Sequence, residues 1–450
     1  LCCFRRFNQR MHNKLLVVDD AIGVVGGRNY QDDYYDWDSE YNFRDRDVLV
    51  AGPEARVMAA NFEAFWKAPR SVPAERLNDV GRILLDSGPP SLPPAVYRRP
   101  ERVERVLAEA IDDAWITRSF VDTALPVASV RYVADLPRKH RRETVEQPRN
   151  GQHVTEPQLD RLIAEAQSEV LLQTPYLVLS KPARKLFADL RRQADPPRVL
   201  VSTNSLAATD NPIVYALSYK YKRRNMRELG FNIFEFKPFP LDAPVDYRNL
   251  LPDPIAGDSP EGGRGGLLGG SAAGSNARPP GSGGRNDGSA RDTAAPRSNP
   301  RTGSAYQNAR ERRRAAGSEV ERDLLRTETR PSFLGSKAVN RPLPVTRQGA
   351  RMGLHAKSLV VDRRIGVIGT HNFDPRSENY NTEGAVIIDD PVFAQRLADS
   401  ILRDIHPQNS WTVAPRSKPP VLSGLNYSMG KASEALPILD FWPWRYATDY

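Results

Sequence analysis

Two short segments, one near the start of the chain and one near its end, carry the same pair of reactive side chains. His12 is followed two residues later by Lys14, and His355 is followed by Lys357. Residues two apart in an extended chain point to the same side, so each imidazole is expected beside an ammonium group. An imidazole can attack phosphorus or transfer a proton, and an ammonium group can hold phosphate oxygens. The spacing therefore indicates phosphodiester chemistry.

The agreement between the two segments extends beyond these pairs. Both segments read His-x-Lys-x4-Asp, and an asparagine follows seventeen residues after each histidine. The matching aspartates are Asp19 and Asp362, and the matching asparagines are Asn29 and Asn372. A single histidine near a lysine is commonplace on protein surfaces, but agreement over this length is typical of an internal repeat.

The duplicated residues supply what phosphodiester transfer without a metal needs. One imidazole can attack phosphorus while the other protonates the departing alcohol, and the roles reverse when an acceptor alcohol arrives. The two lysines, helped by the asparagine amides of Asn29 and Asn372, are expected to bind the phosphate oxygens. We therefore expect the two motifs to form one site.

A histidine that acts as a nucleophile also needs a carboxylate to fix its tautomer. The candidates are Asp45 and Glu383, each of which precedes an apolar strand, and Asp47 is a weaker alternative to Asp45. The motif aspartates Asp19 and Asp362 fall in a turn, about five residues beyond the lysines, so we interpret them as structural.

Around these residues the sequence predicts alternating strands and helices. In each copy, apolar residues after the lysine, a polar turn and a second apolar run predict a β-hairpin. Between the copies we expect helices over 55–67, 156–168 and 215–229 and strands over 129–134, 170–175 and 199–203. This order favours an α/β fold.

Length and composition indicate how many domains there are and what kind of partner they bind. A chain of 450 residues is longer than one core usually serves, and the net charge of +9 favours an anionic partner such as a phospholipid, a membrane surface or a nucleic acid. No apolar run approaches the roughly 20 residues of a membrane-spanning helix. The two cysteines, Cys2 and Cys3, are adjacent, so they cannot build a disulfide framework or a cysteine-based metal site.

Two features subdivide the chain. A proline-rich stretch at 87–100 precedes a predicted boundary near 120–130, which gives a first domain over 1–130 and a second over 131–450. Within the second, residues 253–332 are rich in glycine, serine, arginine and proline, and Tyr306 is their only aromatic residue. Such a segment cannot bury enough apolar area to order itself, so we predict a disordered insertion.

The two motifs resemble the HKD motifs of the phospholipase D superfamily. Within it, four longer phrases are similar to bacterial cardiolipin synthases of the third, periplasm-facing type, and the resemblance covers most of 10–70, 130–240 and 332–395. These phrases are Gly26-Gly27-Arg28-Asn29, Phe43-Arg44-Asp45-Arg46-Asp47, Thr203-Asn204-Ser205-Leu206-Ala207-Ala208-Thr209-Asp210 and Asn372-Phe373-Asp374-Pro375-Arg376-Ser377.

The resemblance implies two phospholipase D-like α/β sandwich domains related by pseudo-twofold symmetry, with the site at their interface. It also implies cardiolipin formation by transfer of a phosphatidyl group to phosphatidylglycerol, with phosphatidylethanolamine as a further possible substrate, no metal or other cofactor, and peripheral attachment to the anionic surface of the bacterial inner membrane. By analogy His12 is the nucleophile and His355 the general acid, although the symmetry of the motifs leaves the reverse assignment open.

The two halves are unequal in length, because only 11 residues precede His12. We therefore expect the first domain to be incomplete, with its opening strands absent, and the chain to be poorly stable. Three other functions remain open: a nuclease with the same phosphohistidine chemistry, a hydrolase that releases phosphatidic acid, and an inactive remnant. Two motifs in one chain favour lipid over nucleic acid as the substrate.

Overall fold

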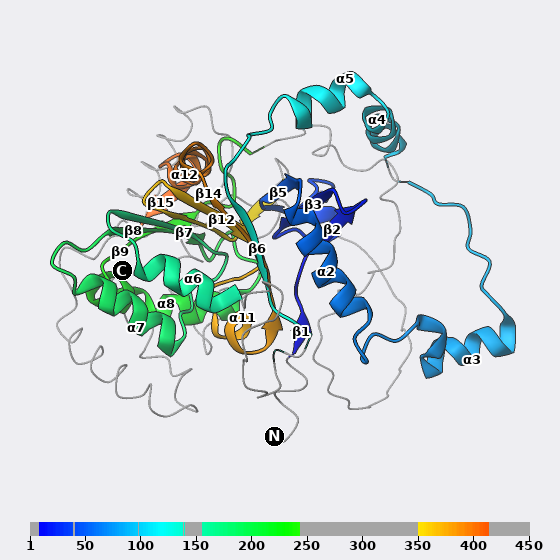
Figure 1. The fold of residues 1–450 in the computed structure, drawn as a ribbon, viewed down its shortest axis with the longest axis horizontal. Coiled ribbons are helices and arrows are strands. Elements are labelled where there is room, and N and C mark those ends of the chain that lie inside the picture. Colours follow the sequence, from blue (N-terminus) through cyan, green and yellow to red (C-terminus); the bar gives the residue numbers. More distant parts are fainter. Residues whose placement is uncertain are drawn as a thin grey trace, which may run out of the picture. The chain divides into compact units, whose positions relative to one another are not determined.

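The computed structural model describes residues 9–38, 41–97, 99–137, 139, 155–243 and 350–413. The predicted insertion at 253–332 lies outside the described residues. The described parts are a mixture of sheets and helices, so the α/β fold class expected from the sequence is confirmed (Figure 1).

The largest element is an eight-stranded sheet. In spatial order its strands are β15 (Ser410–Thr412), β9 (Phe231–Phe236), β8 (Arg198–Asn204), β7 (Glu169–Gln173), β11 (Ser358–Val361), β12 (Ile365–Gly369), β14 (Gly384–Asp389) and β6 (Val130–Ala134). Strands β7, β8 and β9 are parallel, and the other neighbours are antiparallel. The hairpin after His355 is thus inserted beside the parallel strands.

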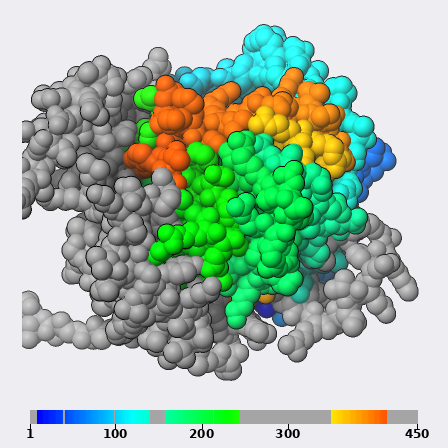
Figure 2. Space-filling model, turned by 90° about the vertical axis from the view of Figure 1, so that its left-hand side faces the viewer, coloured from blue at the N-terminus to red at the C-terminus, as the bar shows by residue number. Residues whose placement is uncertain are grey.

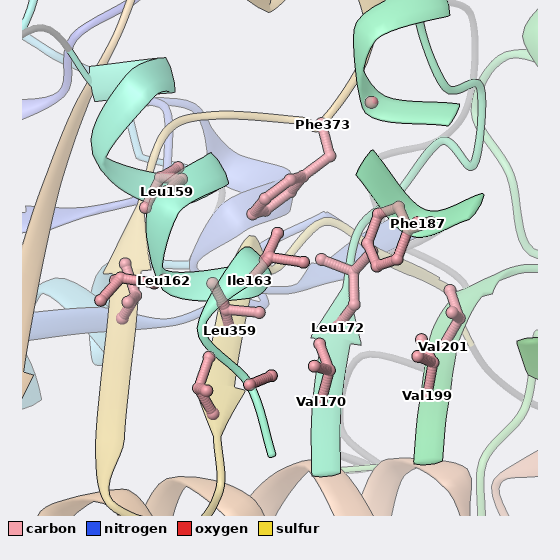
Figure 3. Close-up of a cluster of buried hydrophobic side chains, with 14 of the residues drawn as sticks. Leu159, Leu162, Ile163, Val170, Leu172, Phe187, Val199, Val201, Leu359 and Phe373 are labelled. Atoms are coloured by element: carbon pink, nitrogen blue, oxygen red, sulfur yellow. The ribbon is translucent and has the colours of Figure 1, made fainter. Parts of the chain in front are cut away.

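Helices cover both faces of this sheet because its central strands are apolar on both sides. In β7, Val170 and Leu172 point to one face, where they pack with α6 (Thr155–Ala164) and α7 (Lys181–Arg191) (Figure 3). Leu171 points to the opposite face, where it packs with α12 (Pro391–Ile405). This alternation follows from the two-residue period of a strand, and strands covered on both faces form continuous apolar runs.

The helix boundaries follow from capping residues in the sequence. Ser180 caps α7 by accepting a hydrogen bond from the backbone of Ala183, and Asp390 caps α12 through Phe393, each with a proline in the first turn. Helix α8 (Pro212–Glu228) packs against β9. In the view of Figure 2, residues 155–243 and the α12 to β15 segment adjoin on one face, although residues 244–390 separate them in sequence.

The hairpin that follows His12 belongs to a smaller sheet of three strands. These are β2 (Leu15–Val18), β3 (Ile22–Gly26) and β5 (Asp47–Ala51), and α2 (Glu54–Trp66) packs across them. Both hairpin turns have two central residues with positive φ, Asp19 and Asp20 in the first and Asp362 and Arg363 in the second. This is the geometry of a type I′ turn, so both predicted hairpins are confirmed.

Two short strand pairs connect segments far apart in the sequence. The strand before His12, β1 (Arg10–Met11), runs parallel to β13 (Asn381–Thr382). The strand before His355, β10 (Arg351–Leu354), runs parallel to β4 (Tyr41–Arg44). The strand before His12 thus pairs with the strand before Glu383, and the strand before His355 pairs with the strand before Asp45.

The remaining elements lie mostly between α2 and β6. They are η1 (Asp32–Tyr34), η2 (Ala74–Arg76), α3 (Asn78–Ser87), α4 (Pro100–Ala110), α5 (Asp113–Ile116), the π-helical η3 (Thr117–Val121) and, after the second motif, α11 (Pro375–Asn379). None of the helices among the described residues is both long and apolar enough to cross a membrane.

The six elements predicted between the motifs are all present, with small differences at their ends. The largest difference is in α6, which ends at Ala164, four residues before the predicted end. The backbone N–H of Ser168 binds the carboxylate of Asp362, so that residue belongs to the loop into β7.

Candidate active site

The His-x-Lys pairs have the same local conformation in both motifs. In each motif the pair lies in a three-residue connection between two strands, β1 and β2 or β10 and β11. The ammonium group of Lys14 donates to the carbonyl oxygen of His12 at 2.8 Å, and that of Lys357 donates to the carbonyl oxygen of His355. In the second motif the ammonium group of Lys357 also lies 2.6 Å from Nδ1 of His355, so imidazole and ammonium are side by side there, as predicted.

The first histidine is held by a carboxylate from the second half of the chain. Nδ1 of His12 lies 2.8 Å from Oε2 of Glu383, and the backbone N–H of His12 donates to the carbonyl of Thr382. Glu383 is fully buried, and the hydroxyl of Thr370 also donates to its Oε2. Burial favours the neutral acid, but the hydrogen bond and charge of His12 outweigh it and lower the pKa of Glu383 to about 2. The carboxylate is therefore ionised and fixes the imidazole.

The second histidine is held by a carboxylate from the first half. Nδ1 of His355 lies 2.6 Å from Oδ2 of Asp45, and both side chains are buried. Asp47, the weaker candidate, instead forms an ion pair with Arg28 at 2.9 Å. Because β1 pairs with β13 and β10 pairs with β4, the two carboxylates are exchanged between the motifs. The order of residues in the sequence does not indicate this exchange.

The lysines and carboxylates of both motifs interact as one electrostatic cluster. Burial lowers the pKa of Lys357 to about 7, against the opposing effect of Asp45, and the charge of Lys14 lowers it further. Burial likewise lowers the pKa of Lys14 to about 8, although Glu383 and Asp45 favour its charged form. Each lysine thus interacts with carboxylates from both halves of the chain, so the two motifs converge on one region.

His355 is held in its neutral form. Burial lowers its pKa to about 4, and the ammonium group of Lys357, 2.6 Å from Nδ1, acts in the same direction. Asp45 opposes this shift and remains ionised, because the attraction of Lys357 and His355 outweighs its burial and lowers its pKa. A neutral imidazole that donates Nδ1–H to a carboxylate has its lone pair on Nε2.

Asp45 lies between two arginines where the chain passes from β4 to β5. Arg44 and Arg46 point away from the site and bind the buried carboxylate of Asp404 in α12, with Arg44 Nη1 at 2.7 Å from Oδ1. Gln173 of β7 donates to the same carboxylate at 2.9 Å. The carboxylate of Asp45 contacts His355 instead. The sequence alone did not single out Asp404.

A glycine provides the room for the Asp45 carboxylate. A Cβ atom on Gly27 would lie 2.2 Å from Oδ1 and 2.6 Å from Oδ2 of Asp45. The φ of Gly27 is outside the left-handed region, so space and not backbone conformation requires the glycine. The absence of a side chain at Gly27 thus allows the Asp45 carboxylate to lie beside His355.

The two motif asparagines have different surroundings. The amide of Asn29 donates to the hydroxyl of Tyr34 at 2.8 Å. The Oδ1 atom of Asn372 is buried and has no hydrogen-bond partner in the described part of the chain. Tyr34 itself was not predicted from the sequence, yet its hydroxyl lies 3.3 Å from Nε2 of His355. The repeat does not mark this position, because the residue five positions after Asn372 is Ser377.

The motif aspartates are in the turns, as expected, but only one has hydrogen-bond partners. Asp362 accepts hydrogen bonds from the backbone N–H groups of Gln167, Ser168 and Glu169 and from the Ser168 hydroxyl. Asp19 has no corresponding bond among the described residues, because no strand there lies beside β2 as β7 lies beside β11. Asp362 thus connects the second hairpin turn to the residues that lead into β7.

In the described part of the chain, no cluster of three or more histidine, cysteine, aspartate or glutamate side chains is arranged to hold a metal ion. Glu383 and Asp45 are instead hydrogen-bonded to His12 and His355. The arrangement therefore offers two carboxylate-bound imidazoles, the buried ammonium group of Lys357 and the half-buried ammonium group of Lys14 for the chemistry of an anionic substrate.

The site thus consists of two His-x-Lys pairs, each held by a carboxylate from the other half of the chain. Residues 331–405 match the family described as cardiolipin synthase, PLD-like domain, and this range includes the second motif, Asn372 and Glu383. Residues 331–405 are therefore similar to a phospholipase D-like domain.

Particular relatives extend over more of the chain. An uncharacterized protein of Helicobacter pylori strain J99 is 23% identical over 417 residues, which are 91% of this chain and 60% of that protein. Cardiolipin synthase C of Escherichia coli K12 is 30% identical over 245 residues, which are 52% of this chain and 48% of that enzyme. The chain thus spans between about half and 60% of the length of these relatives.

Among solved structures, the phosphatidylserine synthase of Haemophilus influenzae Rd KW20 aligns with 90% of this chain and 63% of its own. The two chains are 13% identical, and the TM-score is 0.41.

Proposed function

We propose that this protein is a phosphatidyltransferase that forms cardiolipin through a phosphohistidine intermediate. The observation that carries the proposal is the exchange of carboxylates: Glu383 holds His12 and Asp45 holds His355, so neither half alone contains a complete pair. Similarity to a cardiolipin synthase over about half of the chain supports phospholipid as the substrate class. The site residues are His12, Lys14, His355 and Lys357, with Asn29, Asn372, Asp45 and Glu383 assisting.

The first step transfers a phosphatidyl group to the protein. Nε2 of His12 attacks phosphorus, the bond from phosphorus to the head-group oxygen breaks, and His355 in its protonated form gives a proton to that oxygen. The free site holds His355 neutral, so the bound phosphate must first draw Lys357 away from the imidazole. The ammonium groups of Lys14 and Lys357 then stabilise the negative charge on the non-bridging oxygens.

The second step releases the lipid product. A hydroxyl of phosphatidylglycerol gives its proton to the now neutral His355 and attacks phosphorus, and the bond between phosphorus and His12 breaks. The product is cardiolipin, and glycerol leaves in the first step if phosphatidylglycerol is also the donor. Phosphatidylethanolamine is the alternative donor, which would release ethanolamine.

The substrates place the protein at a membrane surface. We propose peripheral association with the anionic surface of the bacterial inner membrane, in keeping with the chain's net charge of +9. We also propose two phospholipase D-like domains, over 1–130 and 131–450. Each domain would contribute one His-x-Lys pair to a single shared site.

The proposal is tested by incubating the purified protein with labelled phosphatidylglycerol, with and without phosphatidylethanolamine, and separating the lipids by chromatography. Cardiolipin should form, and His12→Ala and His355→Ala should each abolish it. His406→Ala is the matched control, because His406 is exposed at the end of α12 and takes no part in the site.

Other products would contradict the proposal in different ways. Phosphatidic acid alone would identify a hydrolase, and cleavage of single-stranded DNA that weakens steeply with salt would identify a nuclease. A folded protein that turns over neither substrate would be inactive.

A further inference from the structure

The hydroxyl of Tyr34 occupies the side of His355 that faces away from Asp45. Its oxygen lies 3.3 Å from Nε2 of His355, and the two rings meet edge to face with centroids 5.0 Å apart. Tyr34 is buried and stacks on Phe43, with ring centroids 4.5 Å apart. The phenol is thus fixed by packing, and its hydroxyl reaches the nitrogen that would react with a substrate.

The direction of the hydroxyl proton follows from its two neighbours. A phenol has one proton to donate, and the amide of Asn29 donates to the phenol oxygen at 2.8 Å. Because an amide N–H cannot accept, the phenol proton is left for Nε2 of His355. Burial raises the pKa of Tyr34 above its ordinary range, so the proton stays on the phenol at neutral pH. Nε2 of His355 therefore accepts a hydrogen bond through its lone pair.

His12 has no equivalent arrangement. Among the described residues, the side chain of His12 bonds only to Glu383, through Nδ1, and no group binds its Nε2. The repeat explains the difference, because the residue five positions after Asn372 is Ser377, where Tyr34 follows Asn29. The hydroxyl of Ser377 is used locally, as the acceptor of the backbone N–H of Asn372 at 3.2 Å.

We propose that Tyr34 is a positioning residue that makes the two motif histidines unequal. In the free site its hydroxyl donates to Nε2 of the neutral His355 and engages the lone pair that would otherwise attack phosphorus, so only His12 is available as the nucleophile. This hydrogen bond opens when His355 takes up or gives the proton of the transfer steps. This inference rests on the proposed function. On this proposal, a phenol outside both motifs determines which histidine attacks phosphorus.

The first test uses a phosphatidyl ester of p-nitrophenol, whose leaving group needs no proton. His12→Ala should show no burst of nitrophenol, because Tyr34 still engages His355. The double variant His12→Ala, Tyr34→Phe should regain a burst, with the phosphatidyl adduct on the peptide that contains His355. Tyr41→Phe in place of Tyr34→Phe is the matched control, since the Tyr41 hydroxyl donates to the carbonyl of Ala208 and not to a histidine.

The second test does not depend on turnover. In the protein with ¹⁵N-labelled histidine, Tyr34→Phe should move the Nε2 resonance of His355 to the position of a nitrogen without a hydrogen bond. It should also raise the pKa of His355, because a bond that favours the neutral ring is lost while Asp45, Lys357 and Lys14 remain beside it. Tyr41→Phe should change neither quantity.

The outcomes separate this inference from the proposed function. If wild-type protein releases nitrophenol but the double variant does not, or if the adduct stays absent from His355, the role of Tyr34 is wrong and the transferase proposal stands. If wild-type protein releases no nitrophenol, the proposed function fails, and the resonance of His355 decides the role of Tyr34 alone. An unchanged Nε2 resonance and pKa in Tyr34→Phe would overturn it.

Discussion

Nδ1 of His12 lies 2.8 Å from the carboxylate of Glu383, although the two residues are 371 positions apart. The contact follows from the parallel pairing of β1 with β13, which places Met11 opposite Thr382 and so brings the next residue of each strand together. The same construction brings Asp45 to His355 through β4 and β10. Either half folded alone would therefore leave its own histidine without a carboxylate partner.

This exchange predicts which carboxylate controls which histidine. Glu383→Gln should disturb the tautomer of His12 and leave that of His355 unchanged, and Asp45→Asn should do the reverse. Losing the carboxylate of a catalytic histidine can cost up to about 10⁴-fold in rate, so we expect a loss of roughly 10²-fold or more in lipid turnover for each variant. Nitrogen chemical shifts of the two imidazoles are the direct measurement.

Asp47→Asn is the control for this experiment. Asp47 belongs to the same Phe43 to Asp47 phrase, but it forms an ion pair with Arg28 at the surface. Asp47→Asn should therefore leave the nitrogen chemical shifts of both imidazoles unchanged. A response of His12 to Asp45→Asn in place of Glu383→Gln would show that the pairing is not exchanged.

Space at Gly27 predicts an effect on the second histidine. In Gly27→Ala the new methyl group would lie 2.2 Å from Oδ1 of Asp45 and displace the carboxylate. The variant should therefore lose turnover by about as much as Asp45→Asn, while its folded structure is retained because φ at this position suits alanine. Circular dichroism measures whether the fold is retained, and the ¹⁵N shift of His355 measures whether the Asp45 carboxylate has been displaced. Full activity in Gly27→Ala would contradict it.

Local sequence patterns sufficed for much of the fold. The two hairpins were predictable because alternation of apolar residues and a polar turn are local properties, and each hairpin is confirmed. Helix α2 was predictable to within one residue at each end from its amphipathic pattern. The repeat also indicated that His12, Lys14, His355 and Lys357 act together, because two copies of one motif imply a shared task.

The rest of the site depends on contacts that no local pattern contains. The exchange of Asp45 and Glu383 arises from strand pairing across more than 300 residues. Asp404 lies on a helix with an ordinary amphipathic sequence, and only the folded chain brings it to Arg44 and Arg46. Tyr34 breaks the repeat instead of following it, so a search for matching positions passes over it.

The buried carboxylate of Asp404 should contribute strongly to stability. Asp404→Ala would leave Arg44 and Arg46 without their common partner, and removal of one member of a buried ion pair costs about 3–5 kcal/mol. Asp389→Ala is the matched control, because the Asp389 to Arg364 pair is exposed and such pairs contribute about 0–1 kcal/mol. Urea unfolding of both variants measures the difference. Equal midpoints would argue against the role of Asp404.

The buried histidines predict a loss of stability in mild acid. Burial lowers the pKa of His371 from an ordinary value of 6.5 to about 4. Between these values the unfolded chain takes up a proton that the folded protein excludes, so stability present above pH 6.5 is lost as the pH falls towards 4. His355 acts in the same direction. The melting temperature should fall from pH 7 to pH 5, and less steeply in His371→Asn. Identical slopes for the two proteins would contradict this assignment.

Binding of an anion should be coupled to uptake of protons by the lysines. Burial lowers the pKa of Lys357 to about 7, so at pH 8 it is mostly neutral in the free protein. Lys14, with a pKa of about 8, is then about half neutral. A bound phosphate favours the ammonium form of both lysines, so roughly one to one and a half protons should be taken up per anion bound, most of them by Lys357. Calorimetric titration with inorganic phosphate at pH 8, in buffers of different ionisation enthalpy, gives the number directly. Lys357→Arg should bind phosphate with less proton uptake, because a guanidinium group is already charged, whereas Lys185→Arg on the exposed face of α7 should behave as wild type. Equal proton uptake by wild type and Lys357→Arg would place the titrating group elsewhere.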